Sequence, residues 1–212
     1  MRNPIKQLIE FEGLPVLTPR YGEPYWYYMN YLSNNRNLLN AMLEQHSKVL
    51  FLRFDLRFPE TACWEEPMSY LLKFLDLFRR WLVTCEFDPQ YVIRMEQKTS
   101  INPHFHVALL LNGNKANEAN SYYYKQVAEQ TWENAVRTNM TGLVDYCDRD
   151  KLGYPLPEGI LIVRPPERTG IKVQTTLEYQ AAFKAVSYLA KYVPEDEIPS
   201  VQRKVFYSLC NR

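Results

Sequence analysis

Hydrophobic and polar residues alternate with a period of two in residues 49–58. The apolar positions are Leu52, Phe54, Leu56 and Phe58, and the polar positions between them are Arg53, Asp55 and Arg57. Because successive side chains of a strand point to opposite faces, this pattern predicts a strand with one apolar and one charged face.

Two further apolar segments, residues 91–98 and 104–111, are separated by a turn signal at Asn102-Pro103. Their Val, Ile and long apolar side chains favour strands. The polar sequence Asn112-Gly113-Asn114 ends the second segment. We expect the two segments to pair as an antiparallel hairpin, and we expect residues 159–163 to form a short additional strand.

Helical spacing of apolar residues recurs in four segments, which we predict as helices. These segments are residues 25–44, 67–88, 121–138 and 175–192. Pro24 and Pro67 precede or open the first two, where a proline is well tolerated. The last helix would begin with a capping box of Thr175 and Glu178 and would end before Pro194.

The order of the predicted elements after residue 48 is strand, helix, strand, strand, helix, strand, helix. It favours an α+β fold with a central, mainly antiparallel sheet flanked by helices, and disfavours a doubly wound parallel sheet. We divide the chain into an N-terminal arm and helix, residues 1–47, and a core domain, residues 48–212. Residues 1–23 are expected to be irregular, and the aromatic run Tyr25–Tyr28 suits either the core or base stacking.

Composition restricts the class of protein. The chain has 212 residues, 46% of them hydrophobic, and a net charge of +1. A chain of this length and composition can bury a hydrophobic core. A surface that coats duplex DNA is not expected at this low net charge, because such binding grows with the number of phosphates neutralised. No apolar run approaches the roughly 18 residues of a membrane span. We therefore expect a soluble, cytoplasmic protein that has no membrane partner and makes only local contacts with nucleic acid.

The four cysteines are far apart in the sequence and never form a CxxC pair. They are Cys63, Cys85, Cys147 and Cys210. This spacing indicates neither a zinc knuckle nor a disulfide framework, so we expect reduced thiols.

Two of the three histidines stand as His104-Phe105-His106 within a predicted strand. Residues two apart in a strand share a face, so both imidazoles can converge on one metal ion while Phe105 points into the core. The same pattern also suits two histidines that are simply hydrogen-bonded on a half-exposed strand.

Glu96 is the candidate third ligand. If residues 91–98 and 104–111 pair as a hairpin, its carboxylate comes close to the histidines. Two imidazoles and one carboxylate suit Mg²⁺ or Mn²⁺ and leave coordination positions open for a phosphate oxygen. Asp55, on the polar face of the first strand, is the alternative ligand, and an exposed Glu96 paired with Lys98 is the structural alternative.

The final predicted helix carries Tyr188, Lys191 and Tyr192, which would line one stripe at spacings of three and four, with Lys184 one turn earlier. A phenol is a poor nucleophile near its usual pKa of about 10. Polarisation of a phosphate by a metal ion, together with a nearby ammonium, can offset this. Covalent capture of a DNA phosphate is therefore chemically reasonable, although such a stripe also occurs for structural reasons alone.

Taken in order, these three elements resemble the three motifs of HUH endonucleases, the His-hydrophobe-His initiators of rolling-circle replication. The matching segments are Leu52-Arg-Phe-Asp-Leu-Arg-Phe58, Pro103-His-Phe-His106 and Tyr188-Leu-Ala-Lys-Tyr192. Inovirus-type replication initiators of filamentous phages and bacterial prophages are the closest resemblance. It spans roughly residues 48–195.

The resemblance implies a ferredoxin-like or RNA-recognition-motif-like sheet with the metal site on it. It implies that His104, His106 and Glu96 hold Mg²⁺ or Mn²⁺ and that Tyr188 attacks the scissile phosphate. A 5′-phosphotyrosine and a free 3′-OH would result. Lys191 would orient the tyrosine or stabilise phosphate charge.

Tyr192 matches the second tyrosine of two-tyrosine members, and the sequence leaves open whether one or two tyrosines act. The implied partner is single-stranded DNA at a replication origin. The chain has no GxxxxGK[ST] segment, so unwinding and synthesis would need a host helicase and polymerase.

A local phosphate track on the exposed sheet is the expected site of further DNA contacts. Its candidate residues are Arg53, Arg57, Arg94 and Lys98, and Lys184 of the last predicted helix is a further candidate for DNA contact. Scattered surface salt bridges explain each of these equally well. Two other functions fit the same residues: a metal-bound, non-catalytic regulator that binds single-stranded or origin DNA, and a phosphodiesterase that uses water.

Overall fold

The computed structural model describes residues 4–60, 64–97, 101–149, 156–192 and 205–207. It is an α+β structure whose main sheet has the strand order β10-β6-β7-β5-β8, with β9 also beside β5. The strands are β5 Lys48–Leu56, β6 Gln90–Glu96, β7 His104–Asn112, β8 Val144–Asp145, β9 Ile160–Val163 and β10 Val205–Tyr207. All pairings in this sheet are antiparallel. The predicted α+β class and the predicted pairing of β6 with β7 are confirmed.

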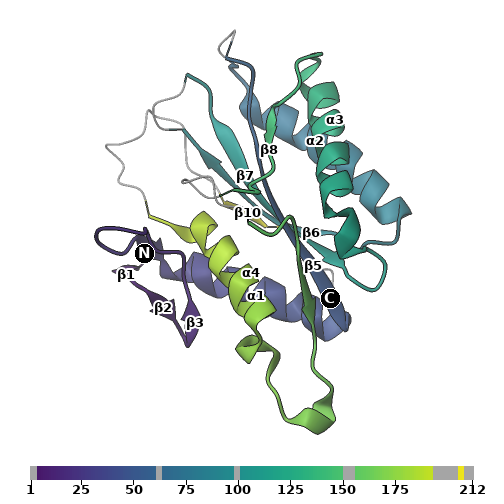
Figure 1. The fold of residues 1–212 in the computed structure, drawn as a ribbon. Coiled ribbons are helices and arrows are strands. Elements are labelled where there is room, and N and C mark those ends of the chain that lie inside the picture. The colour runs from purple at the N-terminus through teal and green to yellow at the C-terminus, as the bar shows by residue number, and fades with distance from the viewer. Residues whose placement is uncertain (1–3, 61–63, 98–100, 150–155, 193–204, 208–212) are drawn as a thin grey trace.

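Helices cover both faces of the sheet (Figure 1). Their bounds are Met29–Gln45 for α1, Pro67–Thr84 for α2, Ser121–Val136 for α3 and Leu177–Ser187 for α4. The first face packs against α2 and α3, and the second against α1 and α4. The predicted apolar and charged faces of β5 are confirmed, but the charged face is covered and not exposed as a phosphate track requires, since Arg53 is half-buried and Asp55 is only 7% exposed.

The face toward α2 and α3 is apolar and fixes the two central strands. Trp132 of α3 is fully buried there and makes edge-on ring contacts with Phe74 of α2 and Phe105 of β7. Its indole N–H donates to the backbone oxygen of Arg57 at 2.6 Å. Burial of one such side chain contributes on the order of 2–3 kcal/mol. This core therefore holds β5 and β7, which carry much of the candidate site.

The opposite face of the sheet divides into an apolar half and a polar half. The apolar half packs against α1 and α4 and contains Val49, Phe51, Val92, Ala108 and Leu110. The polar half follows on the same three strands and contains Arg53, Asp55, Arg94, Glu96, His104 and His106. Because residues spaced by two share a face, these six side chains gather at one end of the sheet.

The N-terminal segment contains strands where the sequence predicted an irregular arm. Strand β1, Ile5–Gln7, pairs with β4, Trp26–Tyr28, and β2, Glu10–Phe11, forms a hairpin with β3, Leu14–Pro15. Gly13 takes the left-handed conformation, with φ of 80°, in that hairpin turn. The predicted start of the first helix near residue 25 is also wrong. Pairing with β1 holds the β-prone residues 26–28 in a strand, and α1 begins only at Met29.

The last helix is shorter than predicted. Helix α4 ends at Ser187, and a single 3-10 turn, Tyr188–Ala190, follows it. The chain then becomes extended: Lys191 forms an antiparallel bridge with Tyr27, and the N–H of Tyr192 donates to the backbone oxygen of Trp26 at 2.6 Å. Pairing with β4 thus ends the helix before Pro194 does. The predicted helical stripe of residues 188, 191 and 192 is therefore wrong.

The start of this helix also differs by one residue. Thr176, and not Thr175, is the N-cap, since its hydroxyl accepts a hydrogen bond from the N–H of Tyr179 at 3.3 Å. Thr175 lies in a short 3-10 turn, Val173–Thr175, and its hydroxyl donates to the backbone oxygen of Lys172. The predicted capping box of Thr175 and Glu178 is therefore wrong.

Two further properties of the described chain bear on the sequence predictions. None of the helices within the described ranges combines the length and apolar character that crossing a bilayer requires. Cys85 and Cys147 are free thiols, as expected. Cys63 and Cys210 lie outside the described residues.

Candidate metal centre

Strand register brings the candidate ligands together. Strand β7 lies between β6 and β5, and Glu96 is directly opposite His104 across the β6–β7 pair. His106 has two cross-strand neighbours, Arg94 on β6 and Asp55 on β5. The centre is therefore a direct consequence of antiparallel pairing in this register.

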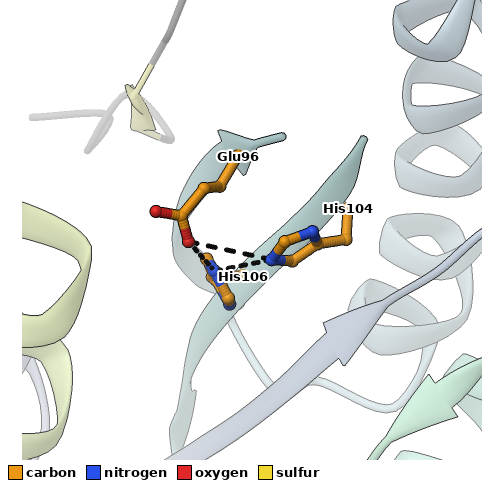
Figure 2. A group of neighbouring side chains, drawn as sticks. All are labelled: Glu96, His104 and His106. Carbon is orange, nitrogen blue, oxygen red and sulfur yellow. Dashed lines mark hydrogen bonds and ion pairs between the residues drawn. The ribbon is translucent and has the colours of Figure 1, made fainter. Parts of the chain in front are cut away.

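Three ligand atoms of Glu96, His104 and His106 converge on one point (Figure 2). The Nε2 atoms of the two histidines are 3.1 Å apart. The Oε2 atom of Glu96 lies 2.9 Å from Nε2 of His106 and 3.7 Å from Nε2 of His104. Glu96 and His106 are buried, and His104 is half-buried. A ligand could therefore reach this group from the side of His104.

These separations fit the coordination of a single divalent ion. Neighbouring ligands of an octahedral ion with bonds of about 2.1 Å lie about 3.0 Å apart. On a tetrahedral ion of similar bond length they lie about 3.4 Å apart. The three observed separations lie around these values, and the donor set of two imidazoles and one carboxylate suits several divalent metals. The group could therefore bind a metal ion, as the sequence predicted, and its geometry does not select one metal.

Asp55 occupies a different position from the one predicted for an alternative ligand. Its Oδ1 atom lies 2.8 Å from Nδ1 of His106, on the side of the ring opposite the converging Nε2 atom. A carboxylate at Nδ1 keeps the proton on that nitrogen and leaves the lone pair of Nε2 for a metal ion. Asp55 therefore orients His106 and does not belong to the converging group.

Burial and neighbouring charges set the protonation of the two rings. Burial, reinforced by the adjacent His106, lowers the pKa of His104 to about 4. Burial also opposes a charge on His106, but the Asp55 carboxylate outweighs it and raises the pKa of that ring above its usual value. Burial would raise the pKa of Asp55, yet His106 lowers it. His104 is thus neutral near pH 7, the form in which imidazole binds metals.

Tyr188 lies beside this group. Its ring is edge-on to that of His106, with 4.9 Å between centroids. The guanidinium carbon of Arg53 lies 4.4 Å from the centroid of the Tyr188 ring. Burial, and after it the charge of Glu96, raises the pKa of the Tyr188 phenol to about 12. Arg53 lowers this pKa without outweighing the burial, so the phenol is protonated at neutral pH.

Lys191 and Tyr192 point to different neighbours. The Nζ atom of Lys191 lies 3.8 Å from the ring centroid of Tyr25 and 6.0 Å from that of Tyr188. The ring of Tyr192 contacts Tyr28, with 5.4 Å between centroids. Of Tyr188 and Tyr192, the ring contacts of the described residues thus place only Tyr188 against His106.

Arg94 is not exposed, contrary to the prediction of a phosphate track on the open sheet. It is 3% exposed, because the turn that follows α4 covers it. Its Nη1 atom donates to the backbone oxygens of Leu189 at 3.1 Å and of Lys191 at 2.5 Å. Arg94 therefore fixes the turn that carries Tyr188.

The other predicted DNA-binding residues are scattered. Arg53 is half-buried against Tyr188, and Arg57 is exposed and pairs with Asp145 at 2.6 Å. Lys184 is exposed on α4, and Lys98 lies outside the described residues. Among the described residues of this set, Arg53 and the buried Arg94 lie against Tyr188 or the turn that carries it, and the charge of Arg57 acts on His104.

Sequence reasoning missed the contribution of the N-terminal segment. Tyr25 contacts Lys191, and the backbone of residues 26–27 pairs with residues 191–192. No local pattern could have revealed this, since the two segments are far apart in the sequence. The aromatic run itself was the only available signal.

Comparison with known proteins adds a family. No curated protein matches the chain, and no solved structure matches it. A family model described as the YagK/YfjJ C-terminal domain matches residues 10–148. This range contains Glu96, His104 and His106 and is more than half of the chain. The protein, with its paired histidines and glutamate on neighbouring strands, belongs to the YagK/YfjJ C-terminal domain family.

Proposed function

We propose that this protein is a metal-dependent endonuclease that nicks single-stranded DNA, of the HUH type that initiates rolling-circle replication. One observation carries the proposal: a phenol, that of Tyr188, lies against His106 of a group whose three ligand atoms converge. A nucleophile and a phosphate-polarising site on one face of a sheet are what phosphoryl transfer requires.

In this proposal Glu96, His104 and His106 hold Mg²⁺ or Mn²⁺. The bound ion would polarise the scissile phosphate and neutralise charge that develops on it. Tyr188 would lose its phenolic proton to solvent or a base and attack the phosphorus. The bond from phosphorus to the 3′ oxygen would break, and that oxygen would take up a proton. The products are a 5′-phosphotyrosyl protein and a free 3′-OH.

Positively charged side chains near Tyr188 favour the anionic form of its phenol. Arg53 lies over the Tyr188 ring, and Arg94 also lowers the pKa of its phenol. The Nζ atom of Lys191 is 6.0 Å from the ring centroid. Positive charge here favours the phenolate and the anionic transition state. Arg53 and Arg94 do not outweigh burial, which raises the pKa of Tyr188 to about 12, so a bound divalent ion would have to supply further positive charge to the phenol.

The fold is compatible with this assignment. An antiparallel sheet with the ligands on its central strands and helices α2 and α3 behind it suits a ferredoxin-like HUH core. We accordingly propose single-stranded DNA at a replication origin as substrate, with helicase and polymerase supplied by the bacterial host.

Covalent capture tests the proposal. The protein is incubated with Mn²⁺ and single-stranded DNA from the neighbourhood of its own coding sequence, and the mixture is resolved on a denaturing gel. A covalent protein–DNA band that Tyr188→Phe abolishes is the expected result. Cleavage without a band would favour a water-dependent phosphodiesterase. Reversible binding without cleavage on any strand of that region would favour a DNA-binding regulator.

A further inference from the structure

The N-terminal segment holds the part of the chain that follows Tyr188. Lys191 forms an antiparallel bridge with Tyr27, and the N–H of Tyr192 donates to the backbone oxygen of Trp26. Tyr27 itself is fully buried, and its hydroxyl donates to the backbone oxygen of Leu17. The strand to which Lys191 is tied is therefore anchored in the core.

The side chain of Lys191 is held as well as its backbone. Its Nζ atom lies 3.8 Å from the centroid of the Tyr25 ring, well within the range of a cation–π interaction. Both residues are half-buried. A lysine has a flexible four-carbon stem, so an ammonium without such a contact would sample a wide region. The ring face is a contact that keeps it in the neighbourhood of Tyr188, whose centroid is 6.0 Å away.

We infer that Tyr25 is a positioning residue: it holds the Lys191 ammonium beside Tyr188, where the ammonium meets a phosphate of the bound single strand. The phosphate contact rests on the proposed function, whereas the Tyr25–Lys191 contact does not. With Tyr25 in this role, the N-terminal segment belongs to the proposed active site and does more than pack on the core.

A double-mutant cycle tests this inference on the full chain. Tyr25→Leu, Lys191→Met and the double variant are compared for reversible binding of an oligothymidylate in EDTA, over a range of salt concentrations. Lys191→Met should lower the slope of log affinity against log salt by about 0.7, the value for one lost phosphate contact on a single strand. Tyr25→Leu should weaken binding about three- to tenfold, and the double variant should bind no more weakly than Lys191→Met alone.

Two matched variants separate positioning from general packing. Tyr25→Phe keeps the ring face and should bind like the wild type, whereas a loss equal to that of Tyr25→Leu would overturn the inference. Tyr28→Leu removes a ring that contacts Tyr31 and Tyr192 and should leave the salt slope unchanged. Additive losses in the cycle would also overturn the inference.

An NMR measurement without DNA keeps this test independent of the nicking activity. The methylene protons of Lys191 should resonate upfield because of the Tyr25 ring, and Tyr25→Leu should remove that shift. If the shift is present but no covalent adduct ever forms, the positioning contact stands and the proposed function fails. If adducts form equally fast in the wild type and in Tyr25→Leu, the function stands and the inference fails.

Discussion

The ring of Tyr188 meets that of His106 edge-on, at 84° between their planes. This contact exists because α4 ends one residue earlier, at Ser187, and the following turn folds back over the polar half of the sheet. A continuous helix would carry residues 188 and 192 one turn apart on the same stripe. The break in the helix instead separates the two tyrosines.

The separation predicts different effects for the two tyrosines. Tyr192→Phe should form the covalent adduct at close to the wild-type rate, because the ring that contacts Tyr28 is kept and we propose Tyr188, not Tyr192, as the nucleophile. Tyr188→Phe should form none. Rates of adduct formation on one oligonucleotide measure both. If Tyr192→Phe loses the adduct and Tyr188→Phe keeps it, then Tyr192 and not Tyr188 is the nucleophile.

Asp55 should matter for metal affinity although it is not a ligand. Asp55→Asn removes the charge at Nδ1 of His106, so the ring is less firmly oriented and less basic at Nε2. We expect Mn²⁺ to bind about 10- to 100-fold more weakly, as is typical when the partner of a metal-binding histidine is lost. Calorimetric titration with Mn²⁺ measures this directly.

Asp145→Asn is the matched control for Asp55→Asn. Asp145 is the cross-strand neighbour of Asp55, and its carboxylate pairs with Arg57 outside the converging group. Its substitution should leave the Mn²⁺ affinity within about twofold of the wild-type value, because an exposed ion pair contributes little to the stability of the fold. If both variants lose the same Mn²⁺ affinity, the loss comes from the removal of negative charge in general and not from the orientation of His106.

The converging group of Glu96, His104 and His106 could be predicted from the sequence because it depends on one strand pair. The period of two places His104 and His106 on one face, and a hairpin register brings Glu96 opposite His104. Both features can be recognised in a short stretch of sequence. The role of Asp55 could not be predicted, because it depends on how β5 is paired on the other side of β7.

The wrong predictions share a physical cause. The segments at residues 25–28 and 188–192 have helical spacing, but each pairs with a distant segment, and tertiary pairing outweighs local periodicity. Arg94 alternates with apolar residues as an exposed residue would, yet the turn after α4 covers it. Burial of a charge in this way depends on elements that a strand pattern cannot reveal.

Arg94 should be needed for stability and for the shape of the tyrosine turn. Arg94→Met leaves the backbone oxygens of Leu189 and Lys191 without their charged donor in a buried site. We expect the free energy of unfolding to fall by about 2–3 kcal/mol, and adduct formation to slow even where the variant is fully folded. Urea denaturation and the gel assay measure the two effects. Lys184→Met, at an exposed position of α4, should change neither by much.

The N-cap of α4 can be tested by comparing two adjacent threonines. Thr176→Ala removes the oxygen that accepts from the N–H of Tyr179 and should lower the free energy of unfolding by about 1 kcal/mol. Thr175→Ala removes a hydroxyl that donates to Lys172 in an exposed turn and should cost less than half as much. Thermal denaturation of both variants ranks them. The reverse order would restore the capping box predicted from the sequence.

Alkaline pH should destabilise the fold through buried tyrosines. Burial raises the pKa of Tyr179 to about 12, and burial likewise raises that of Tyr27. Above a pH of about 10, the usual tyrosine pKa, the unfolded chain loses these protons while the folded chain keeps them. A raised pKa therefore contributes stability that is complete below that pH and is lost as the pH rises toward the folded pKa. Each proton changes the free energy of unfolding by at most about 1.4 kcal/mol per pH unit.

Lys125 fixes the window for this measurement. Burial lowers the pKa of Lys125. Its contribution to stability therefore increases as the pH rises, opposite to that of the tyrosines, and stops changing near the usual lysine pKa of about 10.4. Urea unfolding is therefore followed from about pH 10.5 upward, with the phenolate absorbance recorded in parallel. Tyr179→Phe keeps the ring but loses the hydroxyl that donates to Asn40 at 2.8 Å. The free energy of unfolding of this variant should fall less steeply with pH, by up to about 1.4 kcal/mol per pH unit, the effect of one proton. A stability that stays level in this window, or an unchanged slope in Tyr179→Phe, would contradict the burial of these phenols.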